Sequence, residues 1–220
     1  MNRLGTLLAG LFALGLAVAF GVTLGVWLPQ TWGAEPLFYE QGAQYLPFVS
    51  ANPVSWQIFH TAANLSLLAA LPLIALLSQH VPSDTRPAGQ TIGLVGTAAF
   101  LLASLMDQFM TPVLARWAVG HIEVAFRLWE TIEPFRDNGL KTIAFLCLGI
   151  WFLWVAAVYE RPYRWLTQGT GAAVLLLGLV ELLIPQPWKT SGAKQAFWAC
   201  PCSSSPSGVS PPPTGFGRRS

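Results

Sequence analysis

The sequence predicts an all-α integral membrane protein, a bundle of about five transmembrane helices with one amphipathic interfacial helix. Only 10% of the 220 residues are charged, whereas a soluble domain carries about 25%. The hydrophobic residues, 53% of the chain, fall in long uncharged runs, and about 20 such residues cross a bilayer core of about 30 Å. Because lipid offers the backbone no hydrogen-bond partner, each run predicts a helix.

The first predicted span covers residues 4–28 and contains no charged residue. A cleaved signal peptide is the alternative, because Arg3 precedes the apolar run and Ala17-Val18-Ala19 has the small residues of a cleavage site. We favour a retained helix, since the apolar run continues to Leu28.

Small residues recur at every fourth position of this span. Small side chains let membrane helices approach closely, so the pattern predicts a tight helix contact, with other membrane proteins or with a second copy as candidate partners. We call these residues the small-residue stripe: Gly5, Ala9, Ala13, Ala17, Gly21 and Gly25.

Residues 29–57 are rich in proline and aromatic residues and contain no Lys or Arg. Aromatic side chains favour the headgroup zone, so we expect a loop on the membrane surface with a short helix near residues 40–49. The second span is predicted at 58–79, with a kink at Pro72. The third is predicted at 91–111 and is stopped by Pro112.

Residues 113–133 form the predicted amphipathic helix. Charged residues recur along one face at helical spacing, and Glu123 and Arg127 are spaced for an i,i+4 ion pair. A helix lying in the membrane interface explains this pattern, and a sixth span beside a polar cavity is the alternative. The charged residues of this amphipathic stripe are Arg116, Glu123, Arg127 and Glu130.

Two more spans complete the predicted transmembrane domain, which covers residues 1–185. The fourth covers residues 140–159 and follows the turn signal Asn138-Gly139. The fifth covers residues 165–184, although its uncharged core is short. The last segment, residues 186–220, is rich in Pro, Ser and Gly, which predicts a disordered tail. Its abrupt change of composition also resembles the product of a frame error.

The distribution of positive charge predicts a cytoplasmic N-terminus in a cell membrane, because Arg3 precedes the first span and the next loop lacks Lys and Arg. A six-span topology gives a small excess of Lys and Arg on the cytoplasmic side, whereas a five-span topology gives no excess. We favour five, since six would bury Glu123, Arg127 and Glu130 at about 2.5–3.5 kcal/mol each.

Polar residues inside the five spans are expected in one leaflet, because successive helices alternate in direction. Ionisable groups in spans face inward and pair, so these residues are candidates for a ligand or ion site. Hydrogen bonding that only holds the helices together is the competing interpretation. The predicted polar layer contains His60, Asn64, Asp107, Gln108, Lys141 and Glu181.

Three classes of function remain open. We favour a structural or partner-binding membrane protein, because no internal repeat or pair of broken helices indicates a transporter. A small-molecule or proton-coupled transporter or channel that uses the polar layer is the first alternative. A haem-binding or enzymatic protein is the second, and His60 with His121 would be the axial ligands.

Composition and motifs argue against several other functions. The net charge of +2 without a basic run gives no indication of nucleic-acid binding. The three cysteines form no disulfide framework. No catalytic, nucleotide-binding or metal-binding motif is present. We therefore expect no enzyme activity, no cofactor and no metal, and the lipid bilayer is the one partner that composition itself indicates.

Overall fold

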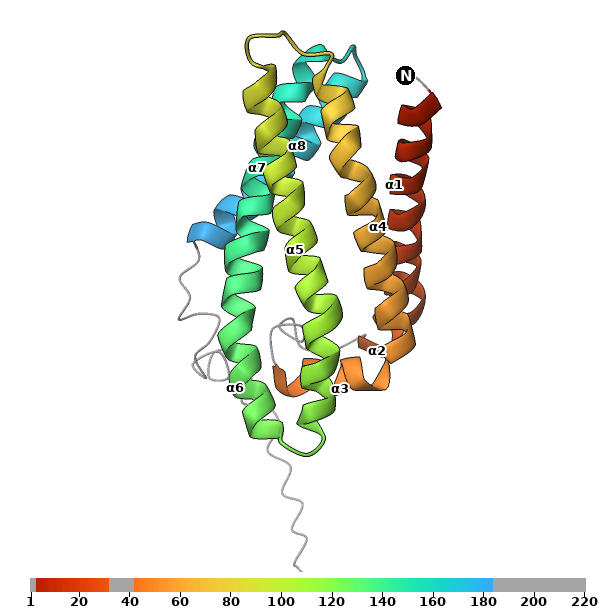
Figure 1. Cartoon of the computed structure of the whole chain (residues 1–220), viewed down its shortest axis with the longest axis vertical. Coiled ribbons are helices and arrows are strands. Elements are labelled where there is room, and N and C mark those ends of the chain that lie inside the picture. Colours follow the sequence, from red (N-terminus) through yellow and green to blue (C-terminus); the bar gives the residue numbers. More distant parts are fainter. Residues whose placement is uncertain (1–2, 32–41, 184–220) are drawn as a thin grey trace, which may run out of the picture. The chain divides into compact units, whose positions relative to one another are not determined.

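The computed structural model describes residues 3–31 and 42–183. No strand occurs among these residues, and five of their helices are long and apolar enough to cross a membrane. The predicted all-α membrane bundle is therefore confirmed (Figure 1). The chain divides into the unit 1–185 and the unit 186–220. The tail predicted at 186–220 lies outside the described residues, as does most of the loop predicted before α3.

The first helix is longer than the uncharged run that predicts it. It comprises α1 (Arg3–Val22), the π-helical segment η1 (Thr23–Trp27) and α2 (Leu28–Thr31), which form one run of 29 residues. This helix packs against α4 (Pro53–Ser78). A Cβ at Gly15 would lie 2.6 Å from the carbonyl oxygen of Ala62, and the Ser66 hydroxyl donates to the carbonyl of Phe12 at 3.1 Å. The two backbones are therefore in direct contact.

The small-residue stripe contributes little to this contact. Gly5 is buried, but the later members of the stripe, from Ala13 to Gly25, are exposed. A Cβ at Gly21 or Gly25 would meet no atom within 4 Å. Within one chain, α1 therefore uses a different face, which includes Gly15 and Ala19, to contact α4.

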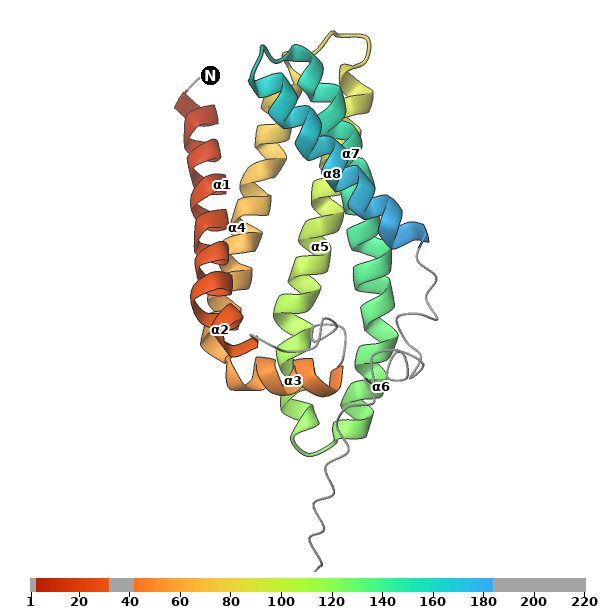
Figure 2. The same ribbon diagram turned by 180° about the vertical axis from the view of Figure 1, so that it is seen from behind.

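The short helix α3 (Gly42–Ala51) lies across one end of the bundle (Figure 2). It contacts α4, α5 (Arg86–Ala118) and α6 (Ile122–Glu133). The cluster of hydrophobic side chains at this end contains Trp27, Tyr45, Leu46, Phe48, Val49, Trp56, Leu114, Ala115, Ala125 and Trp129. A separate cluster around Ile74, Trp151 and Val155 lies toward the opposite end of α4.

Helix α5 continues through Pro112, so the prediction that this proline stops the third span is wrong. A proline within a helix removes one backbone hydrogen bond and bends the chain. Here Leu114 and Ala115, just beyond the proline, are buried in the cluster under α3, and this packing holds the next turns in helical conformation. The 33 residues of α5 span about 50 Å at about 1.5 Å per residue.

The predicted amphipathic helix is present as α6, which begins at Ile122 rather than at Val113. It continues through the π-helical segment η3 (Pro134–Lys141) into α7 (Thr142–Val155). Together with the 3₁₀ turn η4 (Ala156–Val158), these segments form one run of 37 residues. In Figure 1, α6 and α7 follow one axis. The turn predicted at Asn138-Gly139 is therefore wrong, because both residues belong to η3.

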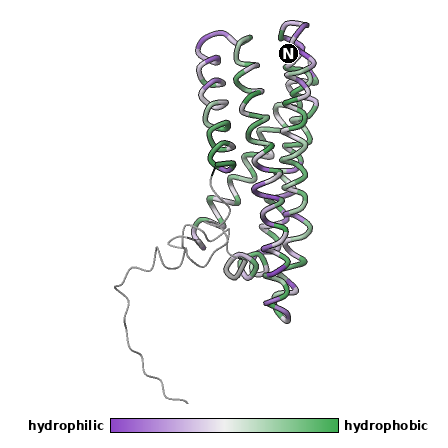
Figure 3. Tube along the Cα trace, turned by 90° about the vertical axis from the view of Figure 1, so that its left-hand side faces the viewer, coloured by the Kyte–Doolittle hydropathy of each residue, from purple (hydrophilic) through white to green (hydrophobic). Residues whose placement is uncertain are grey.

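The last helix, α8 (Tyr163–Leu183), packs closely against α7. A Cβ at Gly149 would lie 2.6 Å from the backbone nitrogen of Leu175, and one at Gly178 would lie 2.9 Å from that of Leu146. Long stretches of these helices carry hydrophobic residues, and hydrophilic residues appear at the turns and within the lower part of the bundle (Figure 3). The five long helices thus pack through glycines and expose large apolar side chains, as expected in lipid.

Candidate functional site

Four charged side chains form a compact cluster where η3 meets α5. Arg136 donates from Nη1 to Asp107 Oδ1 at 2.5 Å. Its Nε and Nη2 atoms donate to the two carboxylate oxygens of Asp137 at 2.9 and 2.7 Å. Lys141 forms a further ion pair with Asp137. We call Asp107, Arg136, Asp137 and Lys141 the ion-pair cluster, in which two positive and two negative charges balance.

The centre of the cluster is removed from solvent. The Arg136 side chain is only 4% exposed. Its guanidinium lies 4.6 Å from the centre of the Trp129 ring, within the range of a cation–π interaction. Asp107 Oδ1 also accepts a hydrogen bond of 2.7 Å from the Thr111 hydroxyl. Buried charges require such partners, because an unpaired charge in the interior is very costly.

A network of amide side chains joins α4 to α5 near the cluster. Asn64 Nδ2 donates to Gln108 Oε1 at 2.6 Å. Gln108 Nε2 in turn donates to Thr61 Oγ1 at 3.0 Å and to Gln57 Oε1 at 3.2 Å. The bonds of this network connect two neighbouring helices. This structural role is enough to account for Asn64 and Gln108.

A cavity of about 220 Å³ lies beside the ion-pair cluster. Aromatic rings form one part of its wall and charged groups form another. Its lining residues are Trp27, Tyr45, Trp56, Phe59, His60, Asp107, Arg136, Asp137 and Lys141. We call this cavity the cluster pocket.

The aromatic part of the wall is a continuous set of ring contacts. The rings of Trp27 and Trp56 stack with centroids 5.6 Å apart, and Phe59 lies 4.5 Å from Trp27. The His60 ring lies 4.4 Å from that of Trp56, and its Nδ1 atom lies 3.4 Å from the Ser104 hydroxyl. Flat apolar surfaces and buried charges thus face the same small space.

Both π-helical segments of the described chain contribute to the cluster pocket. Segment η1 supplies Trp27, and segment η3 supplies Arg136, Asp137 and Lys141. π-Helical turns are rare and occur frequently at functional sites. Two such segments, distant in sequence, meet at one cavity, which makes the cluster pocket the strongest candidate site.

The structure brings together five of the six residues of the predicted polar layer. His60 and Asp107 line the cluster pocket with Lys141, which lies within η3 instead of opening a span. Asn64 and Gln108 lie one step away in the amide network. Glu181 is half-buried near the end of α8, and no described residue of α8 lines the pocket.

Sequence reasoning missed Arg136 and Asp137, which lie between the predicted amphipathic helix and the turn predicted at Asn138-Gly139. A usable signal was present, because Ala125, Trp129, Glu133 and Arg136 recur at helical spacing and all are buried. Pro134 and Asn138-Gly139 masked this continuity. Asp107, a carboxylate within an apolar run, also required a cationic partner.

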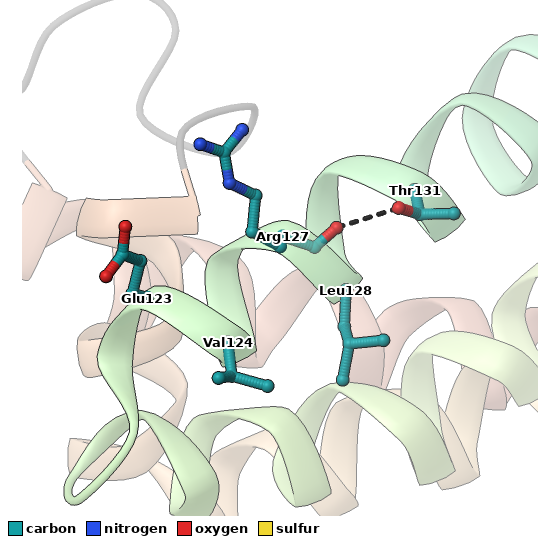
Figure 4. A pocket seen from close by; sticks show the side chains of 5 residues that line it. All are labelled: Glu123, Val124, Arg127, Leu128 and Thr131. Carbon is teal, nitrogen blue, oxygen red and sulfur yellow. Dashed lines mark hydrogen bonds between the residues drawn. The ribbon is translucent and has the colours of Figure 1, made fainter.

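The amphipathic stripe lies on the outside of the molecule. Arg116, Glu123, Arg127 and Glu130 are all exposed, and Arg127 pairs with Glu130 at 3.9 Å rather than with Glu123. Glu123 and Arg127 project from one side of α6 and Val124 from the other, around an open depression of about 400 Å³ (Figure 4). These charges have the position of a solvated helix face.

The two histidines considered as haem ligands differ in environment. His60 is buried on α4, whereas His121 is exposed in the turn between α5 and α6. Among residues 3–31 and 42–183, no group of His, Cys, Asp and Glu side chains is placed to hold a metal ion.

Comparisons with protein-family models, with curated proteins and with solved structures found no match to this chain. The site is therefore defined by its own geometry. It is a buried, charge-balanced cluster beside an aromatic-walled cavity, in a chain with five helices apolar enough to cross a membrane.

Proposed function

We propose that this membrane protein binds a small molecule in the cluster pocket. The observation that supports this most directly is the meeting of the ion-pair cluster, an aromatic wall and both described π-helical segments at one cavity of about 220 Å³. The proposal develops the interpretation of the polar layer as a ligand site. Binding is the step that a transporter, a channel and a receptor would share.

Energetics favour a binding role over a purely structural one. Replacing buried ion pairs by apolar residues of similar volume is often neutral or stabilising. The stability of the fold therefore gives little reason for four charged side chains at one end of an apolar bundle. Their placement on the wall of a cavity gives them access to a ligand.

The proposed topology places the cluster pocket close to one membrane face. Asp107 lies 107 − 86 = 21 residues after Arg86, where α5 begins, which corresponds to about 32 Å of helix and matches a core of about 30 Å. With the N-terminus in the cytoplasm, as Arg3 indicates, this face is the outer one. A ligand could then enter from the headgroup zone.

A fragment-binding experiment on the full chain in detergent tests the proposal. Saturation-transfer NMR with single-ring fragments should detect binders to the unaltered protein. Phe59→Trp should abolish that binding by filling the cluster pocket. Phe100→Trp, at the ring contact with Phe145 away from the pocket, should leave it intact. No binder at all, or binding that survives Phe59→Trp, would contradict the proposal.

A second candidate function is partner binding, with a second copy of the chain as the partner. Its support is the small-residue stripe of α1, which the chain itself leaves largely exposed from Ala13 to Gly25. Close packing of small residues is a common basis of helix association in membranes. The same surface on two copies would make a symmetric contact.

Leucine substitutions on α1 test self-association. Ala17→Leu and Gly21→Leu should each convert a dimer into monomers, because the added side chain separates the two helices. Leu11→Phe is the control, since Leu11 is also exposed and lies about a third of a turn from Ala17 around the helix. Mass measurement by light scattering in detergent gives the result. A monomeric unaltered protein, or an equal effect of all three changes, would exclude the stripe as the contact.

A further inference from the structure

We infer that the cluster pocket selects a neutral, planar, single-ring molecule that carries a hydrogen-bond donor, such as a phenol or an aromatic amide. This inference rests on the proposed function and names the class of ligand. Size, ring contacts, charge balance and the second carboxylate oxygen of Asp107 support it in turn.

The volume of the pocket limits the ligand to about one ring. A cavity of about 150 Å³ accommodates benzene, and sites for drug-sized molecules start at about 300 Å³. The cluster pocket, at about 220 Å³, lies between these values. It therefore has room for a six-membered ring with one small polar substituent.

The aromatic wall favours a flat ligand. The Trp27 ring already contacts those of Trp56 and Phe59, with centroid distances of 5.6 and 4.5 Å, the range in which rings attract each other. Tyr45 extends this wall, with its ring 5.6 Å from that of Trp56. A planar ring would extend the same set of contacts, whereas a branched aliphatic body would fit the flat faces less well.

The charge balance of the wall favours a neutral ligand. Each carboxylate of the ion-pair cluster already pairs with a cation, and each cation with a carboxylate. A charged ligand would add an uncompensated charge to a buried site, which is costly. A neutral ligand leaves the existing pairs intact.

The same wall can accept a hydrogen bond from the ligand. Within the described part of the chain, the bonds from Arg136 and Thr111 to Asp107 both end at Oδ1. The second oxygen, Oδ2, is therefore available as an acceptor beside the pocket. A hydroxyl or amide substituent supplies the matching donor.

A matched set of ligands tests the class. Titration calorimetry of the full chain in detergent compares phenol and benzamide with benzoate, benzylamine and toluene, with the Phe59→Trp variant as the reference for partition into micelles. We expect phenol and benzamide to bind at least tenfold more tightly than the others. Tighter binding of benzoate, benzylamine or toluene would overturn the inferred class but keep the proposed function. If none of the five compounds shows binding that Phe59→Trp abolishes, both the inferred ligand class and the proposed function are excluded.

Discussion

Arg136 is the residue on which the ion-pair cluster depends. Its planar guanidinium donates to Asp107 on α5 and to both oxygens of Asp137 on η3, which a lysine could not do with the same geometry. Through these bonds it ties the long helix of α6 and α7 to α5. It also lies over Trp129, whose ring belongs to the hydrophobic cluster under α3.

Removing this guanidinium should destabilise the protein strongly. We expect Arg136→Gln to lower the free energy of unfolding by about 3–5 kcal/mol, because two buried carboxylates lose their main partner. Arg127→Gln is the control, since its pair with Glu130 is exposed and contributes at most about 1 kcal/mol. Unfolding in mixed micelles with increasing SDS measures both. Similar losses would show that the cluster is not buried as described.

Asp107 could be predicted as a site residue from the sequence alone, but its partner could not. A carboxylate within an apolar run is conspicuous. Arg136 lies between Pro134 and Asn138-Gly139, residues that locally favour a turn. Whether the chain turns there or continues as a helix is decided by packing of Trp129 and Ala125 against distant segments, and local residue preferences contain no information on that packing.

At the scale of elements, glycines determine how closely the helices approach. Gly89 and Gly93 on α5 accommodate the rings of Trp154 and Trp151 from α7, and Gly149 on α7 meets the backbone of α8. Such approach maximises dispersion contacts where lipid provides no hydrophobic force between helices.

Two glycines in the same long helix should respond oppositely to alanine. Gly149→Ala should destabilise the protein by about 1–3 kcal/mol, because the new methyl group would overlap the backbone of Leu175. Gly139→Ala should stabilise it by about 0.4–1 kcal/mol, since its Cβ would lie 3.9 Å from the nearest atoms and the unfolded chain would lose freedom. Thermal unfolding in detergent compares the two. Destabilisation by Gly139→Ala would contradict the helical geometry of η3.

The existence of the long helices follows from the sequence, but several of their ends do not. The second span, predicted at 58–79, begins at Pro53, and the third continues past Pro112 to Ala118. Hydrophobicity alone determines which segments can cross a membrane. The ends depend on contacts with α3 and α6, which lie far away in the sequence. These contacts override the local effect of a proline.

At the scale of the transmembrane unit, one long helix explains how five spans coexist with the charges of α6. The run from Ile122 to Val158 has 37 residues and measures about 55 Å, well beyond a core of about 30 Å. Its second half can cross the bilayer while α6 projects from it. In the proposed five-span topology, Glu123, Arg127 and Glu130 stay in water, and the ion-pair cluster lies near the level at which the helix enters the membrane.

Cysteine accessibility on the two sides of the membrane tests this arrangement most directly. In a chain with Cys147, Cys200 and Cys202 replaced by serine, Glu130→Cys and Arg164→Cys are labelled one at a time in sealed, right-side-out vesicles with a membrane-impermeant maleimide. We predict that Glu130→Cys reacts in intact vesicles and that Arg164→Cys reacts only after permeabilisation, because α7 crosses the bilayer between them. Reaction of both from the same side would contradict the five-span arrangement.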